Sequence, residues 1–172
     1  MRFPCHPVDA GFFDNAPLRF VNTVELDAPP RDVFATLADP GTWPRWFPGM
    51  RSATWTSART HAPGSARTVA LAMLTLDEQF FRWQPDRRLS FFVTAQSQPL
   101  VHALAEDYLL DAVAANKTHF TYTVAMEPRV AIRLGGGVAR AYFGSMFRKA
   151  SQGLARYVAH PPTRTTSDAL TH

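Results

Sequence analysis

The sequence contains one cysteine, two lysines and no apolar run long enough to cross a membrane as a helix. The lone cysteine, Cys5, excludes an internal disulfide framework and a cysteine-rich zinc site. His6, Pro7 and Asp9 interrupt the first residues, where a secretory signal needs an unbroken apolar stretch. From these absences we expect a cytoplasmic protein that does not insert stably into a membrane.

Charge is also sparse, and it is mixed in sign. Charged residues make up 19% of the chain, and 18 Lys and Arg residues against 14 Asp and Glu residues give a net charge of +4. Nucleic-acid binding needs basic residues gathered on one surface, whereas here they are scattered and the densest pair is Arg87 and Arg88. The six histidines lack the spacing of a metal site. We therefore expect no nucleic-acid partner, no metal and no cofactor.

Apolar residues make up 46% of the 172 positions, which is enough to close one sizeable core. Residues 1–18 are rich in proline and aromatic residues without periodicity, and we interpret them as an N-terminal extension. Residues 19–159 carry regular patterns and are expected to form a single ligand-binding domain. Residues 160–172, which include Pro161 and Pro162, are expected to be a disordered tail.

The patterned region predicts one strand, two short helices, six further strands and a long helix. Pro30 suits the first position of a helix, and a single helical turn follows with Trp43 and Trp46 on one side. Apolar residues at helical spacing predict a long helix to Val158, which begins after Gly135–Gly137 or is loose there. Alternation predicts strands over residues 19–27, 51–57, 65–74, 76–84, 88–96, 105–113 and 117–127.

This order of elements determines the fold class. Consecutive strands with short turns pair most simply in antiparallel fashion. A strongly curved sheet cannot bury its concave face alone, and the last helix is the only element long enough to cover it. We therefore predict an α+β fold, in which a curved seven-stranded antiparallel sheet grips a long C-terminal helix. The two short helices follow the first strand, and a ligand cavity lies between sheet and helix.

Alternation also assigns side chains to the two faces of the sheet. The concave face receives Glu78, whose carboxylate is either a pocket group or a structural partner of an inward arginine such as Arg67. The same face receives Glu106 together with Tyr108 and Tyr122, whose hydroxyls suit either a ligand or a satisfied core. The candidate ligand-binding residues are Trp46, Arg67, Glu78, Phe80, Phe91, Tyr108, Tyr122, Phe143 and Met146.

The mouth of the cavity is expected between the loop Gln98–Ala103, the turn Trp43–Phe47 and the glycines Gly135–Gly137. His102 lies in that predicted loop. Because histidine is the side chain type suited to acid–base chemistry near neutral pH, it is a candidate acid or base beside Glu78, with a solvated loop histidine as the alternative.

On the convex face, Phe81, Trp83 and Phe92 form an apolar patch, and such patches usually contact something. Either a second copy of the chain in a homodimer or the N-terminal extension is expected to cover it.

Three segments resemble one known family. VELDAPPRDVFATLADPGTWPRWFPGM is similar to its first strand and helix pair, which ends in a tryptophan. GSARTVAL and LDEQFFRWQPDRRLSF are similar to its central hairpin, and NKTHFTYTVAMEPR to a late strand, although Asn-Lys-Thr stands where Gly-Thr is usual. Over residues 20–158 the sequence thus resembles the polyketide cyclase/dehydrase-like members of the START-like (SRPBCC) helix-grip superfamily. The resemblance implies a helix-grip fold and a ligand-facing position for Glu78.

Two classes of function remain open. The first is a module that binds an apolar small molecule, aromatic, polyketide-like or lipid-like. The second is a cyclase/dehydratase-type enzyme that uses the same cavity. The sequence shows no serine-centred triad and no other unambiguous catalytic set, which favours binding. Membrane-associated lipid transfer would need an exposed amphipathic element, and the sequence indicates none.

Overall fold

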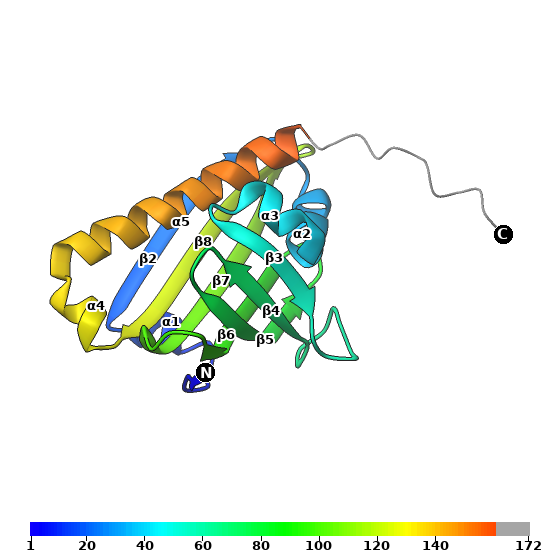
Figure 1. Ribbon diagram of the computed structural model, residues 1–172. Helices are drawn as coiled ribbons and strands as arrows, with labels where there is room; N and C mark the ends of the chain where they lie inside the picture. Colours follow the sequence, from blue (N-terminus) through cyan, green and yellow to red (C-terminus); the bar gives the residue numbers. More distant parts are fainter. Residues whose placement is uncertain (161–172) are drawn as a thin grey trace.

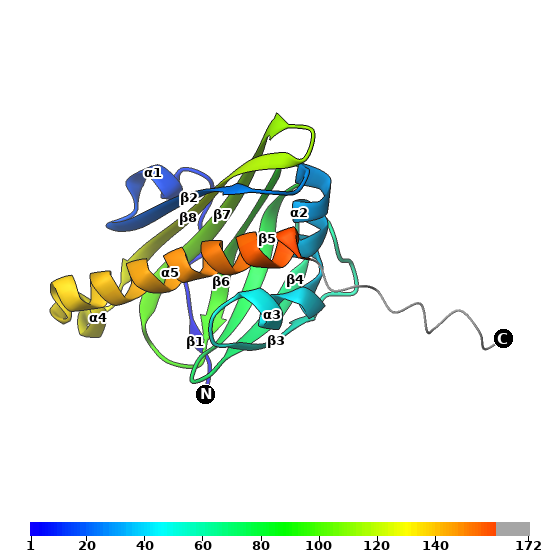
Figure 2. The ribbon, with the colours of Figure 1, turned by 90° about the horizontal axis from the view of Figure 1, so that it is seen from above.

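A long helix, α5 (Gly136–Ala159), lies across the concave face of a curved antiparallel sheet (Figures 1 and 2). The computed structural model describes residues 1–160, and the expected disordered tail therefore lies almost wholly outside the described residues. Within them the sheet has eight strands, in the order β2-β8-β7-β6-β5-β4-β3, with β1 paired to β6. The predicted α+β helix-grip fold is confirmed.

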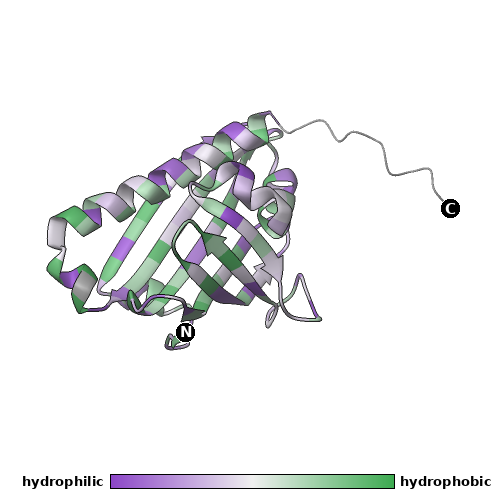
Figure 3. Cartoon of the chain, viewed as in Figure 1, coloured by the Kyte–Doolittle hydropathy of each residue, from purple (hydrophilic) through white to green (hydrophobic). Residues whose placement is uncertain are grey.

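The elements follow the predicted order. Polar and apolar residues alternate along the strands (Figure 3). The strands are β1 (Phe3–Pro4), β2 (Leu18–Leu26), β3 (Met50–Trp55), β4 (Ala66–Leu71), β5 (Thr75–Gln84), β6 (Arg88–Gln96), β7 (Val101–Ala114) and β8 (Lys117–Pro128). The helices are α1 (Phe12–Asn15), α2 (Pro30–Ala38), a 3-10 turn (Pro40–Thr42), α3 (Trp43–Trp46), α4 (Val130–Leu134) and α5.

The eighth strand lies in the N-terminal extension. Phe3 and Pro4 pair with Gln96 and Ala95 of β6, and the backbone of Cys5 continues the contact by donating to the Thr94 carbonyl. A strand of two residues has no periodicity for a sequence pattern to reveal, so seven strands were predicted where eight are present.

Helix α5 is held tightly at its C-terminal end. Phe147, Ala150 and Leu154 are buried against the sheet. Gly153 meets the backbone carbonyl of Trp46 so closely that any Cβ at this position would overlap the oxygen. Toward its beginning the helix separates from α4 at Gly135, and Gly136 has a φ of +48°, a conformation that favours glycine.

The convex face carries its own small apolar cluster, which the N-terminal extension covers. Phe13 is buried there against Phe92, and Phe12 and Phe81 pack around them. Of the predicted patch, Phe81 and Phe92 therefore lie where alternation placed them. Trp83 does not, because a β-bulge between Phe80 and Arg82 shifts the register and turns its ring to the concave side, against Phe34, Trp55 and Phe80.

Candidate functional site

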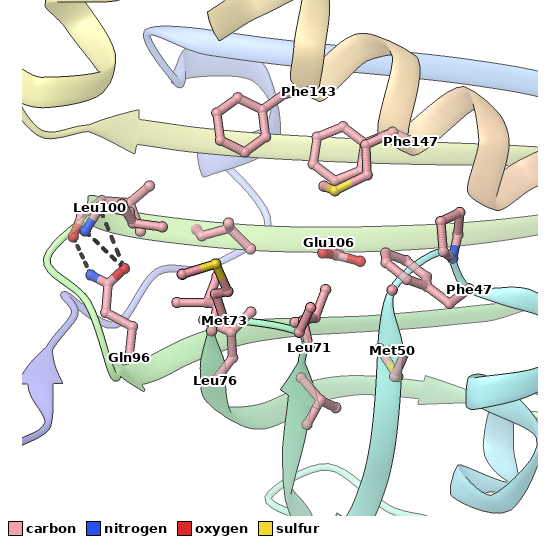
Figure 4. A pocket seen from close by; sticks show the side chains of 18 of the residues that line it. Phe47, Met50, Leu71, Met73, Leu76, Gln96, Leu100, Glu106, Phe143 and Phe147 are labelled. Carbon is pink, nitrogen blue, oxygen red and sulfur yellow. Dashed lines mark hydrogen bonds between the residues drawn. The ribbon is translucent and has the colours of Figure 1, made fainter.

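A cavity of about 440 Å³ lies between the concave face of the sheet and α5 (Figure 4). Most of its wall is apolar, and the side chains come from strands β3 to β8, from helices α3 to α5 and from the loops at one end. Buried polar groups are few, and the acidic ones are the two carboxyl groups of Glu78 and Glu106. The apolar wall includes Met50, Val69, Leu71, Leu76, Leu104, Met126, Phe143, Met146 and Phe147.

Gln96 shapes the loop at the cavity mouth. Its Nε2 donates to the Val101 carbonyl at 2.6 Å, and its Oε1 accepts from the backbone N–H groups of Leu100 and Val101 at 3.2 and 3.3 Å (Figure 4). A second β-bulge, between Asp77 and Glu78, brings Gln96 to the concave side although alternation had placed it outside. Its amide holds the chain between β6 and β7.

The expected pair of Arg67 and Glu78 is present. Nε of Arg67 on β4 donates to Oε2 of Glu78 on β5 at 2.6 Å, and the two residues are opposite each other in the sheet. The guanidinium carbon lies 4.0 Å from the ring centre of Trp43, and the rings of Phe80 and Phe91 lie within about 5 Å. Both terminal nitrogens are buried and have no hydrogen-bond partner among the described residues. Aromatic faces therefore surround the cation.

A second polar group centres on Glu106 of β7. Its Oε2 accepts from the hydroxyl of Tyr108 on the same strand, and from that of Tyr122 on β8 at 2.8 Å. The two tyrosine rings are stacked with their centres 4.8 Å apart. All three side chains are buried, so these hydrogen bonds satisfy both hydroxyl groups within the core.

Burial shifts the acid strengths of these groups. Loss of solvation and, second to it, the negative charge of Glu78 raise the pKa of Glu106 to about 7, against the opposing effects of the tyrosine hydrogen bonds and of Arg67. Burial also raises the pKa of Glu78, against the opposing effect of Arg67. The pKa values of Tyr108 and Tyr122 lie well above their ordinary value, because burial and the neighbouring Glu106 disfavour a phenolate.

The predicted site residues divide into two layers. Glu78, Phe143 and Met146 line the cavity. Arg67 and the aromatic residues Phe80, Phe91, Tyr108 and Tyr122 lie behind this wall in the core. Trp46 is buried in contact with Trp43 and Phe47, and these two line the cavity where Trp46 does not. Alternation identifies the inward face, but it cannot separate cavity wall from the layer beneath it.

His102 lies elsewhere. Strand β7 begins at Val101, so the predicted mouth loop ends earlier than expected and His102 belongs to the strand. A bulge between Val101 and Ala103 leaves it without a ladder partner on β8. Its ring stacks on His6 of the N-terminal extension, with 5.9 Å between ring centres, and it lines a separate hollow that includes Glu127 and Arg133. The expected acid or base role beside Glu78 therefore has no geometric support.

Glu106 was assigned to the inward face but was not selected as a site residue. The available signal was its position two residues before Tyr108 on a strand whose inward residues are apolar. Asp107 directly follows it and pairs on the other face with Arg88 at 2.9 Å. A contact between Glu106 and Tyr122 depends on the exact register of β7 and β8, which a bulge between Ala112 and Ala114 shifts and which alternation alone does not give.

The cavity opens between the loop after β6, the hairpin between β4 and β5, and the region of α4 and α5. Gln98, Met73 and Ile132 lie at this end. The glycines Gly135–Gly137, which were expected to border the mouth, are not among the lining residues. Several large apolar side chains are exposed nearby, an arrangement that the sequence pattern did not indicate: Met73, Val130, Leu134, Val138 and Tyr142.

Two further observations concern membrane spans and metal sites. No helix in residues 1–160 combines the length and apolar character that a membrane span requires. The same part of the chain holds no group of three or more histidine, cysteine or acidic side chains arranged to bind a metal ion.

The sequence of this chain is similar to those of known proteins. The chain is 34% identical over 156 residues to the uncharacterized protein Rv2574 of Mycobacterium tuberculosis, an alignment that covers 90% of this chain and 93% of that protein. Residues 17–159 match the family described as polyketide cyclase / dehydrase and lipid transport.

Comparison of structures gives the same fold. A START superfamily protein from Mycobacterium smegmatis superposes with a TM-score of 0.71 at 10% identity, covering 82% of this chain and 97% of the other. The Zhui aromatase/cyclase from Streptomyces sp. R1128 superposes with a TM-score of 0.63 at 18% identity, covering 82% and 90%. The chain therefore belongs to the polyketide cyclase / dehydrase and lipid transport family, and it has the fold of the START superfamily protein.

Proposed function

We propose that this protein binds an apolar small molecule, aromatic, polyketide-like or lipid-like, in the cavity between the sheet and α5. The observation that carries the proposal is an apolar cavity of about 440 Å³ whose wall holds two buried carboxyl groups. Small-molecule sites have this size and composition, with an apolar wall for affinity and a few polar groups for orientation. The family match supports the same reading, and we place the protein in the cytoplasm.

Native mass spectrometry of the freshly purified protein tests this function directly. We expect an added mass that disappears when the protein is denatured. Leu104 is buried and lines the cavity, so Leu104→Trp should fill the space and abolish the added mass. Leu104→Met, which nearly conserves volume and costs less than about 1.5 kcal/mol, should retain it. If both variants retained the added mass, the result would argue against this cavity as the binding site.

The second candidate is an enzyme of the cyclase/dehydratase kind, and Glu106 is the observation that favours it. A pKa of about 7 lets this carboxyl gain or lose a proton near neutral pH, as a general acid or base requires. Turnover separates the two functions. A poly-β-ketone substrate mimic incubated with the protein should emerge unchanged from a binding module, whereas an enzyme should convert it and lose that activity in Glu106→Gln.

A further inference from the structure

We propose that Glu106, and not the Arg67–Glu78 pair, contacts the polar end of the ligand, donating a hydrogen bond to an uncharged ligand oxygen such as that of a ketone. Carboxylate ligands are excluded. This inference rests on the proposed cavity-binding function and specifies the chemistry of its ligand.

The two oxygens of Glu106 have different surroundings. Oε2 accepts two hydrogen bonds, one from each tyrosine hydroxyl. These two donors occupy both lone-pair sites of that oxygen, so the proton of a neutral Glu106 resides on Oε1. Within residues 1–160 no group hydrogen-bonds to Oε1, and Glu106 is part of the cavity wall. A neutral Glu106 therefore presents an O–H donor to the ligand.

The other buried polar groups of the cavity wall lack a free donor. The indole nitrogen of Trp43 donates to a backbone carbonyl at 3.0 Å, and the amide of Gln96 is engaged with the mouth loop. Glu78, held by Arg67, only accepts. Arg67 itself lies behind the wall under aromatic rings. Among the described buried side chains of the wall, Glu106 is thus the group suited to donate.

Charge explains why carboxylates are excluded. Arg67 on β4 and Glu78 on β5 form a neutral pair, and the groups from β7 and β8 that face Glu106 are uncharged tyrosines. The side chains that α5 contributes to the cavity wall are uncharged. A ligand carboxylate would bring a second negative charge beside Glu78 in a poorly solvated site, where the one positive charge of Arg67 already balances Glu78 and lies behind the cavity wall.

The test uses four probes with one skeleton: 2-acetylnaphthalene accepts only, 1-(2-naphthyl)ethanol donates and accepts, 2-ethylnaphthalene does neither, and 2-naphthoic acid is an anion. Binding is measured by calorimetry on the full chain between about pH 5.5 and pH 8.5. At low pH the ketone should bind about fivefold more tightly than the hydrocarbon, the gain expected from one hydrogen bond. The ketone should lose this gain above about pH 7, where Glu106 ionises, while the alcohol retains it.

Variants separate a contact from a structural role. Glu106→Gln keeps an N–H donor but does not titrate, so ketone binding should become independent of pH. Tyr122→Phe removes a hydrogen bond that lowers the pKa of Glu106, and the midpoint of the pH profile should move upward. Glu78→Gln removes a charge that raises this pKa, and the midpoint should move downward.

The experiment distinguishes failure of the cavity-binding function from failure of the role of Glu106. If none of the probes binds at any pH, the cavity-binding function itself is wrong. Equal binding of ketone and hydrocarbon, tightest binding of the acid, or an unchanged pH profile in Glu106→Gln would overturn the role of Glu106 and leave cavity binding standing.

Discussion

Among residues 1–160, Arg67 is the most deeply buried of the arginine, lysine and acidic side chains. It is 1% exposed, forms one hydrogen bond to Glu78, and otherwise meets aromatic rings. A buried ion pair is often no more stabilising than apolar residues of the same shape, but removing one partner leaves an uncompensated charge. The pair is therefore best understood as a unit, and removing one partner should cost more stability than replacing both.

A double-mutant cycle checks this interpretation. Arg67→Met should lower the free energy of unfolding by about 3–5 kcal/mol, because Glu78 loses its partner. Adding Glu78→Leu should restore most of that loss. Denaturant unfolding of the wild type, both single variants and the double variant gives the coupling energy, and additive effects would show that the pair does not act as a unit.

Glu106 should make stability depend on pH. Its pKa is about 7 in the folded protein, against 4.5 as the ordinary value. Between these values the unfolded chain releases the proton first, so rising pH favours unfolding. The stabilisation is complete below about pH 4.5 and is lost as the pH rises through about 7, which amounts to up to about 3 kcal/mol. Denaturant unfolding of Glu106→Gln should show a smaller loss between these pH values than the wild type, and parallel curves would contradict this.

At the scale of single elements, β5 and β6 show where alternation succeeds and where it stops. Glu78 and Phe80 lie on the predicted face, whereas Trp83 and Gln96 lie opposite to it. Two β-bulges cause these two changes of sheet face. A bulge adds one residue to one strand only, and no local sequence signal here marks it, so faces can be read from the sequence only between bulges.

Two glycines inside α5 provide a matched comparison. A Cβ at Gly153 would overlap the carbonyl oxygen of Trp46, whereas a Cβ at Gly144 would make ordinary contact with the Phe20 ring at 3.6 Å. Replacing an interior helical glycine by alanine alone stabilises by up to about 1 kcal/mol. We therefore expect Gly144→Ala to raise the melting temperature and Gly153→Ala to lower it, because α3 must move away from α5. Equal shifts in both variants would refute the close contact.

At the scale of the whole molecule, the N-terminal extension contributes to both the sheet and the convex core. The deletion of residues 1–17 removes β1 and exposes Phe92, against which Phe13 packs. We expect lower stability and stronger binding of an apolar fluorescent dye. The solution mass of full chain and truncated chain then tests whether a homodimer uses this face. Phe13→Ala should reproduce part of the effect, while Val21→Ala, at a half-exposed position, should not. Unchanged dye binding after the deletion would argue that the extension does not cover the face.

The sequence contained most of the architecture and part of the site. Helix spacing, turn residues and alternation are local signals, and they were sufficient for the order of the elements and for the Arg67–Glu78 pair. The site depends in addition on strand register and on tertiary contacts. The hydrogen bond from Tyr122 to Glu106 depends on the register of the β7–β8 hairpin, which a bulge shifts, and the ring stack of His102 on His6 joins segments far apart in the chain. The sequence pattern therefore does not single out Glu106, and it favours His102 for a role that the geometry does not support.

The close contact between Gly153 and Trp46 has a mechanical consequence for α5. It makes the helix a lever whose pivot is near its C-terminal end, while Val138 and Tyr142 at the other end are largely exposed. Tyr142 lies eleven residues from Gly153, about 16 Å along the helix axis, so a slight tilt at the pivot becomes a much larger opening at the far end. Ligands should therefore enter and leave at that end. Amide hydrogen exchange should be faster over residues 136–143 than over 150–158, and ligand should slow it mainly in the first segment; uniform exchange along α5 would exclude such a pivot.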